Sequence, residues 1–93
     1  MAAIEVKLIS SDAAASVFDV RVAADGGQTE FKVAVSQADS RRLAGGKLPP
    51  EELVRRSFEF LLEREPAGSI LRRFALKDIS RYFPEYEAEM DKL

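Results

Sequence analysis

Residues 49–86, which read PPEELVRRSFEFLLEREPAGSILRRFALKDISRYFPEY, decide the fold of this 93-residue chain. The stretch holds six of the eight aromatic residues and the longest run of apolar residues at helical spacing. That run predicts a helix over about residues 50–65. Its apolar positions, at 100° per residue, cover an arc of roughly 200°. They are Leu53, Val54, Phe58, Phe60, Leu61 and Leu62, and Ser57 lies within the same arc.

An arc this wide needs two neighbours: the sheet on one flank, and on the other either the C-terminal segment, residues 69–92, or a second chain. The sequence EPAG at 65–68 ends the long helix, and Ser69 is a suitable cap for a new helical turn. Apolar residues then recur at helical spacing up to Pro84, which begins a last helix. We therefore expect two or three short helices in 69–92, wrapped around the long one.

The N-terminal third of the chain alternates apolar and charged residues, which predicts strands over about residues 3–9, 17–23 and 29–35. Gly26 and Gly27 provide the positive φ angles of a two-residue hairpin turn between the second and third strands. This turn sets a register with three apolar pairs on one face. They are Val22 with Phe31, Val20 with Val33, and Phe18 with Val35.

A short helix over about residues 37–44 is predicted by a capping pattern at Ser36 to Asp39 and by a glycine stop at 45–46. The charged outer face of the strands favours two layers over a sandwich. We therefore expect an α+β fold with residues 1–93 as a single domain. In this fold a three-stranded antiparallel meander is covered on one face by helices at about 37–44, 50–65 and within 69–92.

Composition narrows the function, because the chain has 14 basic and 16 acidic residues and no Cys, His or Trp. Without thiols or imidazoles it lacks the commonest nucleophile, general base and transition-metal ligands. We expect no enzyme activity, no cofactor and no metal. No segment approaches the ~20 apolar residues that span a bilayer, and the N-terminus does not read as a secretory signal. We therefore expect no membrane association and a cytoplasmic location.

Aromatic and aliphatic residues near the C-terminus form the first candidate site. A core of this size leaves part of its apolar surface uncovered, and contiguous exposed aromatics mark interfaces. The alternative is that the same side chains pack on one another and complete the core. The candidate partner interface, for another protein or a second copy of this chain, consists of Leu53, Phe60, Tyr82, Phe83 and Tyr86.

A basic cluster is the second candidate site. If residues 69–83 were one continuous helix, three of its cations would form a stripe able to meet phosphate groups. The overall net charge of −2 and the acidic residues after 84 favour instead a solvated or internally paired basic face. The candidate nucleic-acid contacts are Arg72, Arg73, Lys77 and Arg81.

The run from Ser57 to Glu87 contains the phrase FLLxREPxxSILxxFxLxxIxRYFPEY. In this phrase the chain resembles a group of short bacterial proteins of uncharacterised function. The resemblance covers about a third of the chain and implies no activity and no site residue. The function we expect is that of a non-enzymatic interaction or accessory protein acting through the aromatic C-terminal surface. A nucleic-acid-associated protein is the alternative.

Overall fold

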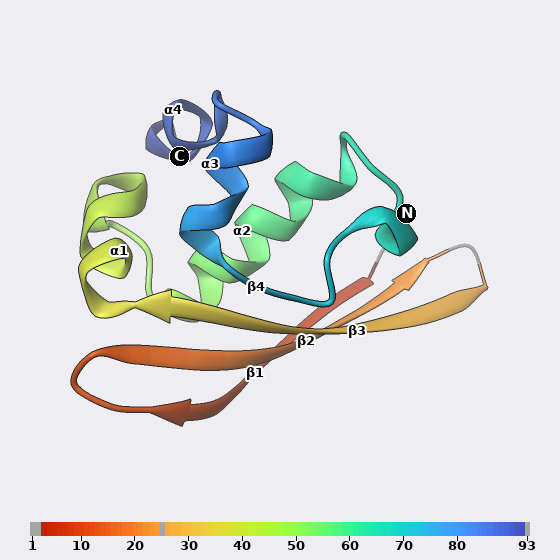
Figure 1. The fold of residues 1–93 in the computed structure, drawn as a ribbon, viewed down its shortest axis with the longest axis horizontal. Coiled ribbons are helices and arrows are strands. Elements are labelled where there is room, and N and C mark those ends of the chain that lie inside the picture. Colours follow the sequence, from red (N-terminus) through yellow and green to blue (C-terminus); the bar gives the residue numbers. More distant parts are fainter. Residues whose placement is uncertain (1–2, 25, 93) are drawn as a thin grey trace.

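Three long strands form an antiparallel meander in the computed structural model, which describes residues 3–24 and 26–92 (Figure 1). The strands are β1 (Ala3–Ser11), β2 (Ala15–Ala24) and β3 (Gly27–Ser36). The predicted meander is confirmed, and so is its apolar face. Six side chains of β2 and β3 on that face are buried: Phe18, Val20, Val22, Phe31, Val33 and Val35.

The predicted register between β2 and β3 is wrong by two residues. Ala24 pairs with Gly27 and Val20 pairs with Phe31, so the turn consists of residues 25 and 26. The predicted Gly26-Gly27 turn is therefore corrected, although residue 25 itself lies outside the described residues. Gly26 has φ +78°, as such a turn requires. Because the shift is even, every side chain keeps its predicted face of the sheet.

Charge pairing on the outer face gives the physical reason for this register. Arg21 lies directly opposite Glu30, and Asp19 lies opposite Lys32. The corresponding nitrogen-to-oxygen distances are 3.4 Å and 3.0 Å. The predicted register would instead have placed Arg21 opposite Lys32, and like charges in directly opposed positions are unfavourable.

A fourth strand, β4 (Arg73–Ala75), pairs in parallel with β3, where a helical turn was predicted. The sheet is therefore mixed, in the order β1-β2-β3-β4. The Lys32 N–H group donates to the Arg72 carbonyl at 2.8 Å, which satisfies a backbone group on the edge of β3. Phe74 of β4 lies with its ring centroid 5.9 Å from that of Phe58. An open sheet edge and this aromatic contact outweigh the local helical spacing.

The helix predicted over 37–44 is observed as α1 (Gln37–Arg42) followed by a 3₁₀ turn over Leu43–Gly46. Ser36 caps α1, because its Oγ accepts from the Asp39 N–H group at 3.0 Å. Gly46 ends the turn with φ +71°. A Cβ at this position would lie 2.6 Å from the Arg41 carbonyl oxygen, so the stop requires glycine.

The long helix α2 spans Pro50–Leu62 and ends three residues before the predicted limit of 65. Phe58 faces the sheet, with its ring centroid 5.0 Å from that of Phe31. The predicted wide apolar arc is confirmed. The buried residues of α2 are Leu53, Val54, Ser57, Phe58, Phe60 and Leu61.

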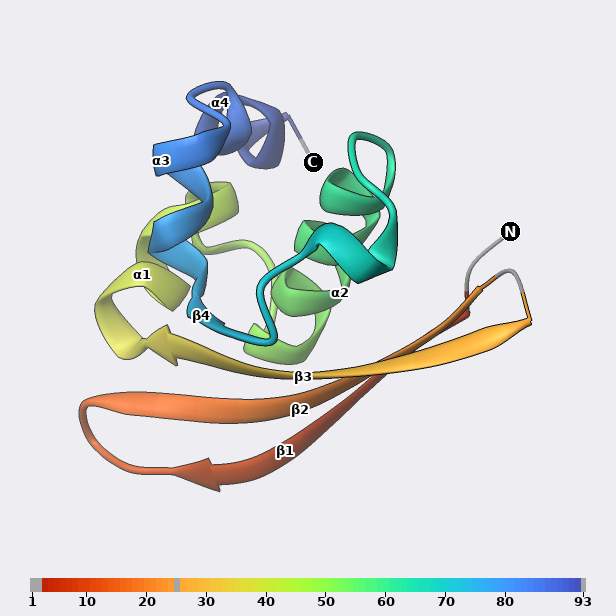
Figure 2. The same ribbon diagram turned by 45° about the vertical axis from the view of Figure 1, so that its right-hand side comes forward.

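The C-terminal segment covers the side of α2 that the sheet does not reach. It contains two short helices, α3 (Ile79–Tyr82) and α4 (Tyr86–Asp91), and two 3₁₀ turns. The five residues that enter the core from it are Ile70, Leu76, Ile79, Tyr86 and Met90. All helices lie on one face of the sheet, which leaves the charged face of the meander uncovered (Figure 2).

Candidate functional site

An apolar pocket of about 230 Å³ lies between the end of α2, the loop after it and α3. Its buried lining comes from Leu61 of α2, Ile70 of the loop and Ile79 of α3. These side chains belong to the hydrophobic core, so the pocket reaches the core from outside. Three separate segments of the chain therefore have to fold before the pocket exists.

Two large apolar side chains of the pocket remain exposed. Leu71 is 54% exposed and Tyr82 is 64% exposed, and both line the pocket. Phe83, which also lines it, is half-buried and meets Phe60 edge to face at 5.8 Å between ring centroids. Apolar side chains gathered at an open pocket are unusual for a surface that serves only solvation.

The polar groups of the pocket are few. Asp78 accepts a hydrogen bond from the Ala75 N–H group at 3.1 Å, so its carboxylate holds the turn between β4 and α3. Glu65 and Ser69 are the remaining polar side chains in the lining. Among residues 3–24 and 26–92, no three Asp or Glu side chains converge as a metal site. The arrangement is suited to receiving an apolar group.

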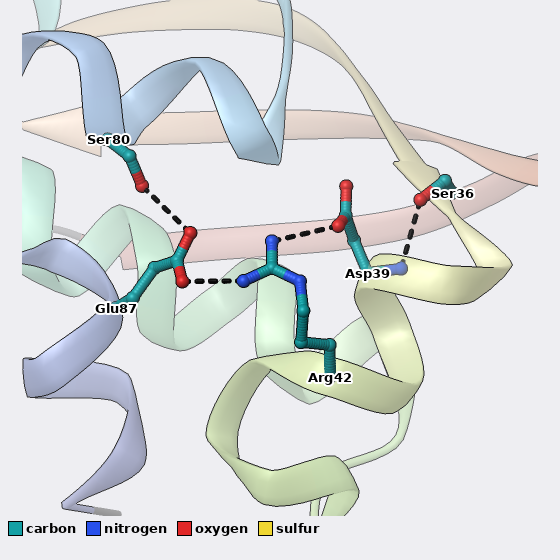
Figure 3. A network of polar contacts seen from close by, with 5 residues as sticks. All are labelled: Ser36, Asp39, Arg42, Ser80 and Glu87. Carbon is teal, nitrogen blue, oxygen red and sulfur yellow. Dashed lines mark hydrogen bonds and ion pairs between the residues drawn. The ribbon is translucent and has the colours of Figure 1, made fainter.

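The helices behind the pocket are fixed by a polar network that runs from α1 to α4 and α3 (Figure 3). Arg42 donates to Asp39 at 2.9 Å and to Glu87 at 2.5 Å. Ser80 of α3 donates to the other oxygen of Glu87 at 3.2 Å. Hydrogen bonds to Glu87 and Asp39 raise the pKa of Arg42. Figure 3 also shows Ser36, whose cap on α1 extends the network to the end of β3.

A buried hydrogen bond attaches α4 to α2. The Tyr86 hydroxyl lies 2.6 Å from Ser57 Oγ, and Ser57 Oγ donates to the Leu53 carbonyl at 2.8 Å. Burial raises the pKa of Tyr86 to about 12. Arg64, just after α2, adds a second link, because its Nε donates to Oε2 of Glu85 at the start of α4, at 3.2 Å. These contacts hold the frame on which the pocket is built.

The predicted partner interface is divided by the structure between core and surface. Leu53, Phe60 and Tyr86 are buried, at 0%, 4% and 0% exposure, and so complete the core. Tyr82 and Phe83 reach the pocket. The two tyrosines lie on different helices, Tyr82 at the end of α3 and Tyr86 at the start of α4, with Pro84 between them.

Of the pocket residues, the sequence identified only Tyr82 and Phe83 as site residues, and Leu71 is the exposed large apolar residue that it missed. In a helical reading, Leu71 shares the apolar face of Ile70. In the observed extended backbone, adjacent side chains point in opposite directions. Ile70 is therefore buried while Leu71 is exposed. Two large aliphatic residues placed next to each other, Ile70 and Leu71, were the signal available in the sequence.

The predicted basic stripe is not formed, because its residues lie on different elements. Arg73 is in β4 opposite Lys32, on the outer face of the sheet, whereas Arg81 is in α3. The Arg72 guanidinium lies 5.8 Å from the Phe31 ring centroid. Spacing by four residues brings side chains onto one face only in a continuous helix, and here a strand and a 3₁₀ turn intervene.

All four cations of the cluster are exposed, including Lys77. Within the described ranges, 3–24 and 26–92, none of them forms an ion pair. All four are adjacent in sequence to pocket residues: Arg72 to Leu71, Arg73 to Phe74, Lys77 to Asp78, and Arg81 to Tyr82. The chain segment that lines the pocket therefore carries cations that no ion pair among the described residues neutralises.

Comparison of the chain with known protein families, curated proteins and solved structures found no match. The resemblance of Ser57 to Glu87 to short bacterial proteins therefore stays a prediction. In the part of the chain that the structure describes, no helix has the length and hydrophobicity needed to cross a membrane.

Proposed function

We propose that this protein is a non-enzymatic interaction protein that binds a segment of a partner protein in the pocket beside α3. The observation that carries this proposal is the exposure of Leu71 and Tyr82 at the mouth of an apolar pocket. The pocket volume of about 230 Å³ is below the ~300–1,000 Å³ typical of small-molecule sites. It is suited to one large side chain of a partner.

The charges around the pocket favour an acidic amphipathic segment as the occupant. Glu65 and Asp78 line the pocket and disfavour a carboxylate inside it. Arg72, Lys77 and Arg81 have no ion pairs among the described residues and favour carboxylates beside it. A partner segment with a large apolar side chain flanked by Asp or Glu satisfies both conditions.

The experiment uses a displayed library of short peptides, selected on the wild-type protein and measured individually by fluorescence anisotropy. We expect selected peptides to carry an apolar anchor with acidic neighbours. Leu71→Ala and Tyr82→Ala should each weaken binding about tenfold or more, as for central interface residues. Ile9→Ala is the matched control, because Ile9 is a large aliphatic side chain, 50% exposed, on β1 and far from the pocket lining.

Two results would overturn the proposal. One is peptide binding that both pocket variants leave unchanged. The other is preferential binding of duplex or single-stranded nucleic acid at low salt, lost in an Arg73→Glu, Arg81→Glu double variant and unaffected by Tyr82→Ala. A steep loss of affinity with salt would accompany that second result. It would assign the function to the exposed cations and not to the pocket.

A further inference from the structure

The β1 edge of the sheet is open and apolar. β1 pairs with β2 on one side, and no described strand pairs with its other side. Figures 1 and 2 show β1 at the outer margin of the sheet, at the opposite edge from β4. Leu8 is 45% exposed and Ile9 is 50% exposed. Ile4 and Val6 are only half-buried, in contrast to the fully buried apolar residues of β2 and β3.

The hydrogen-bonding direction of β1 follows from the rest of the sheet. The backbone N–H group of Lys32 points to β4, so the backbone N–H and C=O groups of its neighbours Phe31 and Val33 point to β2. By the same alternation, the backbone groups of the odd-numbered residues of β2 point to β1. Ile4, Val6 and Leu8 therefore direct their backbone groups to the open edge. Arg55 of α2 is consistent with this direction, because it donates to the Ile4 carbonyl at 2.5 Å; in a dimer the Leu8 N–H group of the second copy takes its place.

We propose that two copies of this chain pair through their β1 edges, antiparallel, about a twofold axis at Val6. The sequence Ile4-Glu5-Val6-Lys7-Leu8 is complementary to a second, antiparallel copy of itself, because apolar residues then meet apolar residues and opposite charges meet. Each Glu5 then lies opposite the Lys7 of the second copy, and each Ile4 lies opposite Leu8. The two Val6 residues exchange backbone hydrogen bonds at the axis. The two sheets join into one sheet of eight strands.

The protections that keep edge strands apart are missing from this run. Proteins block open edges with inward-pointing charges, bulges or prolines. Here the inward-pointing side chains, Ile4, Val6 and Leu8, are all aliphatic. The bulge of β1 lies between Leu8 and Ser10, beyond the self-complementary run. The charges at positions 5 and 7 have opposite signs, so antiparallel pairing turns them from a barrier into an attraction.

The test is sedimentation of the wild-type protein over a wide concentration range, followed by charge exchange. The wild type should form a dimer as concentration rises. Glu5→Lys places lysines opposite lysines at both ends of the interface, and Lys7→Glu does the same with glutamates. For each variant alone, the dissociation constant of the dimer should rise about tenfold or more. An equimolar mixture of the two restores opposite charges, so it should recover a heterodimer with wild-type affinity.

Glu30→Lys is the matched control for strand stability. Glu5 and Glu30 both lie opposite Arg21, from the two neighbouring strands. Both substitutions therefore set a lysine beside Arg21, but only Glu5 is on the edge. Glu30→Lys should retain the dimer. A wild type that stays monomeric at every concentration would overturn the proposal, as would a mixture of the two edge variants that associates no better than either alone.

Discussion

The hydrogen bond between Tyr86 and Ser57 predicts that the cost of one substitution depends on the other residue. Both side chains are fully buried, and every buried side-chain N or O atom among the described residues has a partner. Ser57 has one hydroxyl hydrogen, and it goes to the Leu53 carbonyl. Tyr86 must therefore donate to Ser57 Oγ. The tyrosine has no second acceptor in this arrangement.

The magnitudes follow from this asymmetry. Ser57→Ala leaves the Tyr86 donor buried without an acceptor, which costs about 1–3 kcal/mol, offset by about 0.5 kcal/mol of improved helix propensity. Tyr86→Phe removes one hydrogen bond and leaves Ser57 bonded to Leu53, at a cost of about 1 kcal/mol. When position 86 is already phenylalanine, there is no buried hydroxyl donor at that position that Ser57→Ala could leave without an acceptor. Its cost in that background should be near zero.

The assay is a double-mutant cycle by urea denaturation at neutral pH. We expect a coupling free energy of about 1–2 kcal/mol between the two sites. If Ser57→Ala reduces the free energy of unfolding equally with tyrosine or phenylalanine at position 86, the assigned donor direction is refuted. A Tyr86→Ala variant should cost about 3–5 kcal/mol, because it also removes the buried ring.

Three other predictions concern single sites. Gly46→Ala should cost more than 1 kcal/mol in thermal unfolding, because its Cβ meets the Arg41 carbonyl and φ is positive, whereas Gly68→Ala, which meets nothing within 4 Å, should be near neutral. Burial raises the pKa of Tyr86 to about 12, so the folded state favours the neutral phenol. This contribution to the free energy of unfolding is complete below pH ~10 and is lost between about pH 10 and 12. The loss should be about 1.4 kcal/mol at pH 11, and Tyr86→Phe should not show it. Backbone hydrogen bonds from Ala15 and Ala14 lower the pKa of Asp12. The turn at Asp12 is therefore stabilised at neutral pH and weakens as acid protonates the carboxylate. The chemical shift of the Ala15 amide should follow this change in an NMR pH titration, and Asp12→Ala should abolish the response.

The elements with strong periodicity could be predicted from the sequence. The arc of α2 is set by spacing along one helix, and Phe58 and Phe60 fall on it without reference to other parts of the chain. The faces of the strands are equally local, since Phe18 and Phe31 alternate with charged neighbours. Register is less local, because the choice between two glycine-containing turns depends on cross-strand charges. Lys32 decides it by pairing with Asp19.

β4 and the pocket could not be predicted, because they depend on contacts between distant segments. The spacing of Ile70, Leu71 and Phe74 fits one helical turn as well as a strand. What selects the strand is the edge of β3, which sequence periodicity does not reveal. The same choice exposes Leu71, so the missed strand and the missed site residue have one cause. Tyr82 was identified as a site candidate but could not be separated from buried Tyr86 by spacing alone.

The parallel pairing of β4 also has a consequence for folding kinetics. Val33 and Phe74 are about forty residues apart, and closing a loop of that length costs entropy before any contact forms. The meander closes over short turns and should form early. β4, with three paired residues, should join late and open first. Segment 66–83 then behaves as the last cooperative unit to form, so a partner bound in the pocket would stabilise this unit and slow its opening.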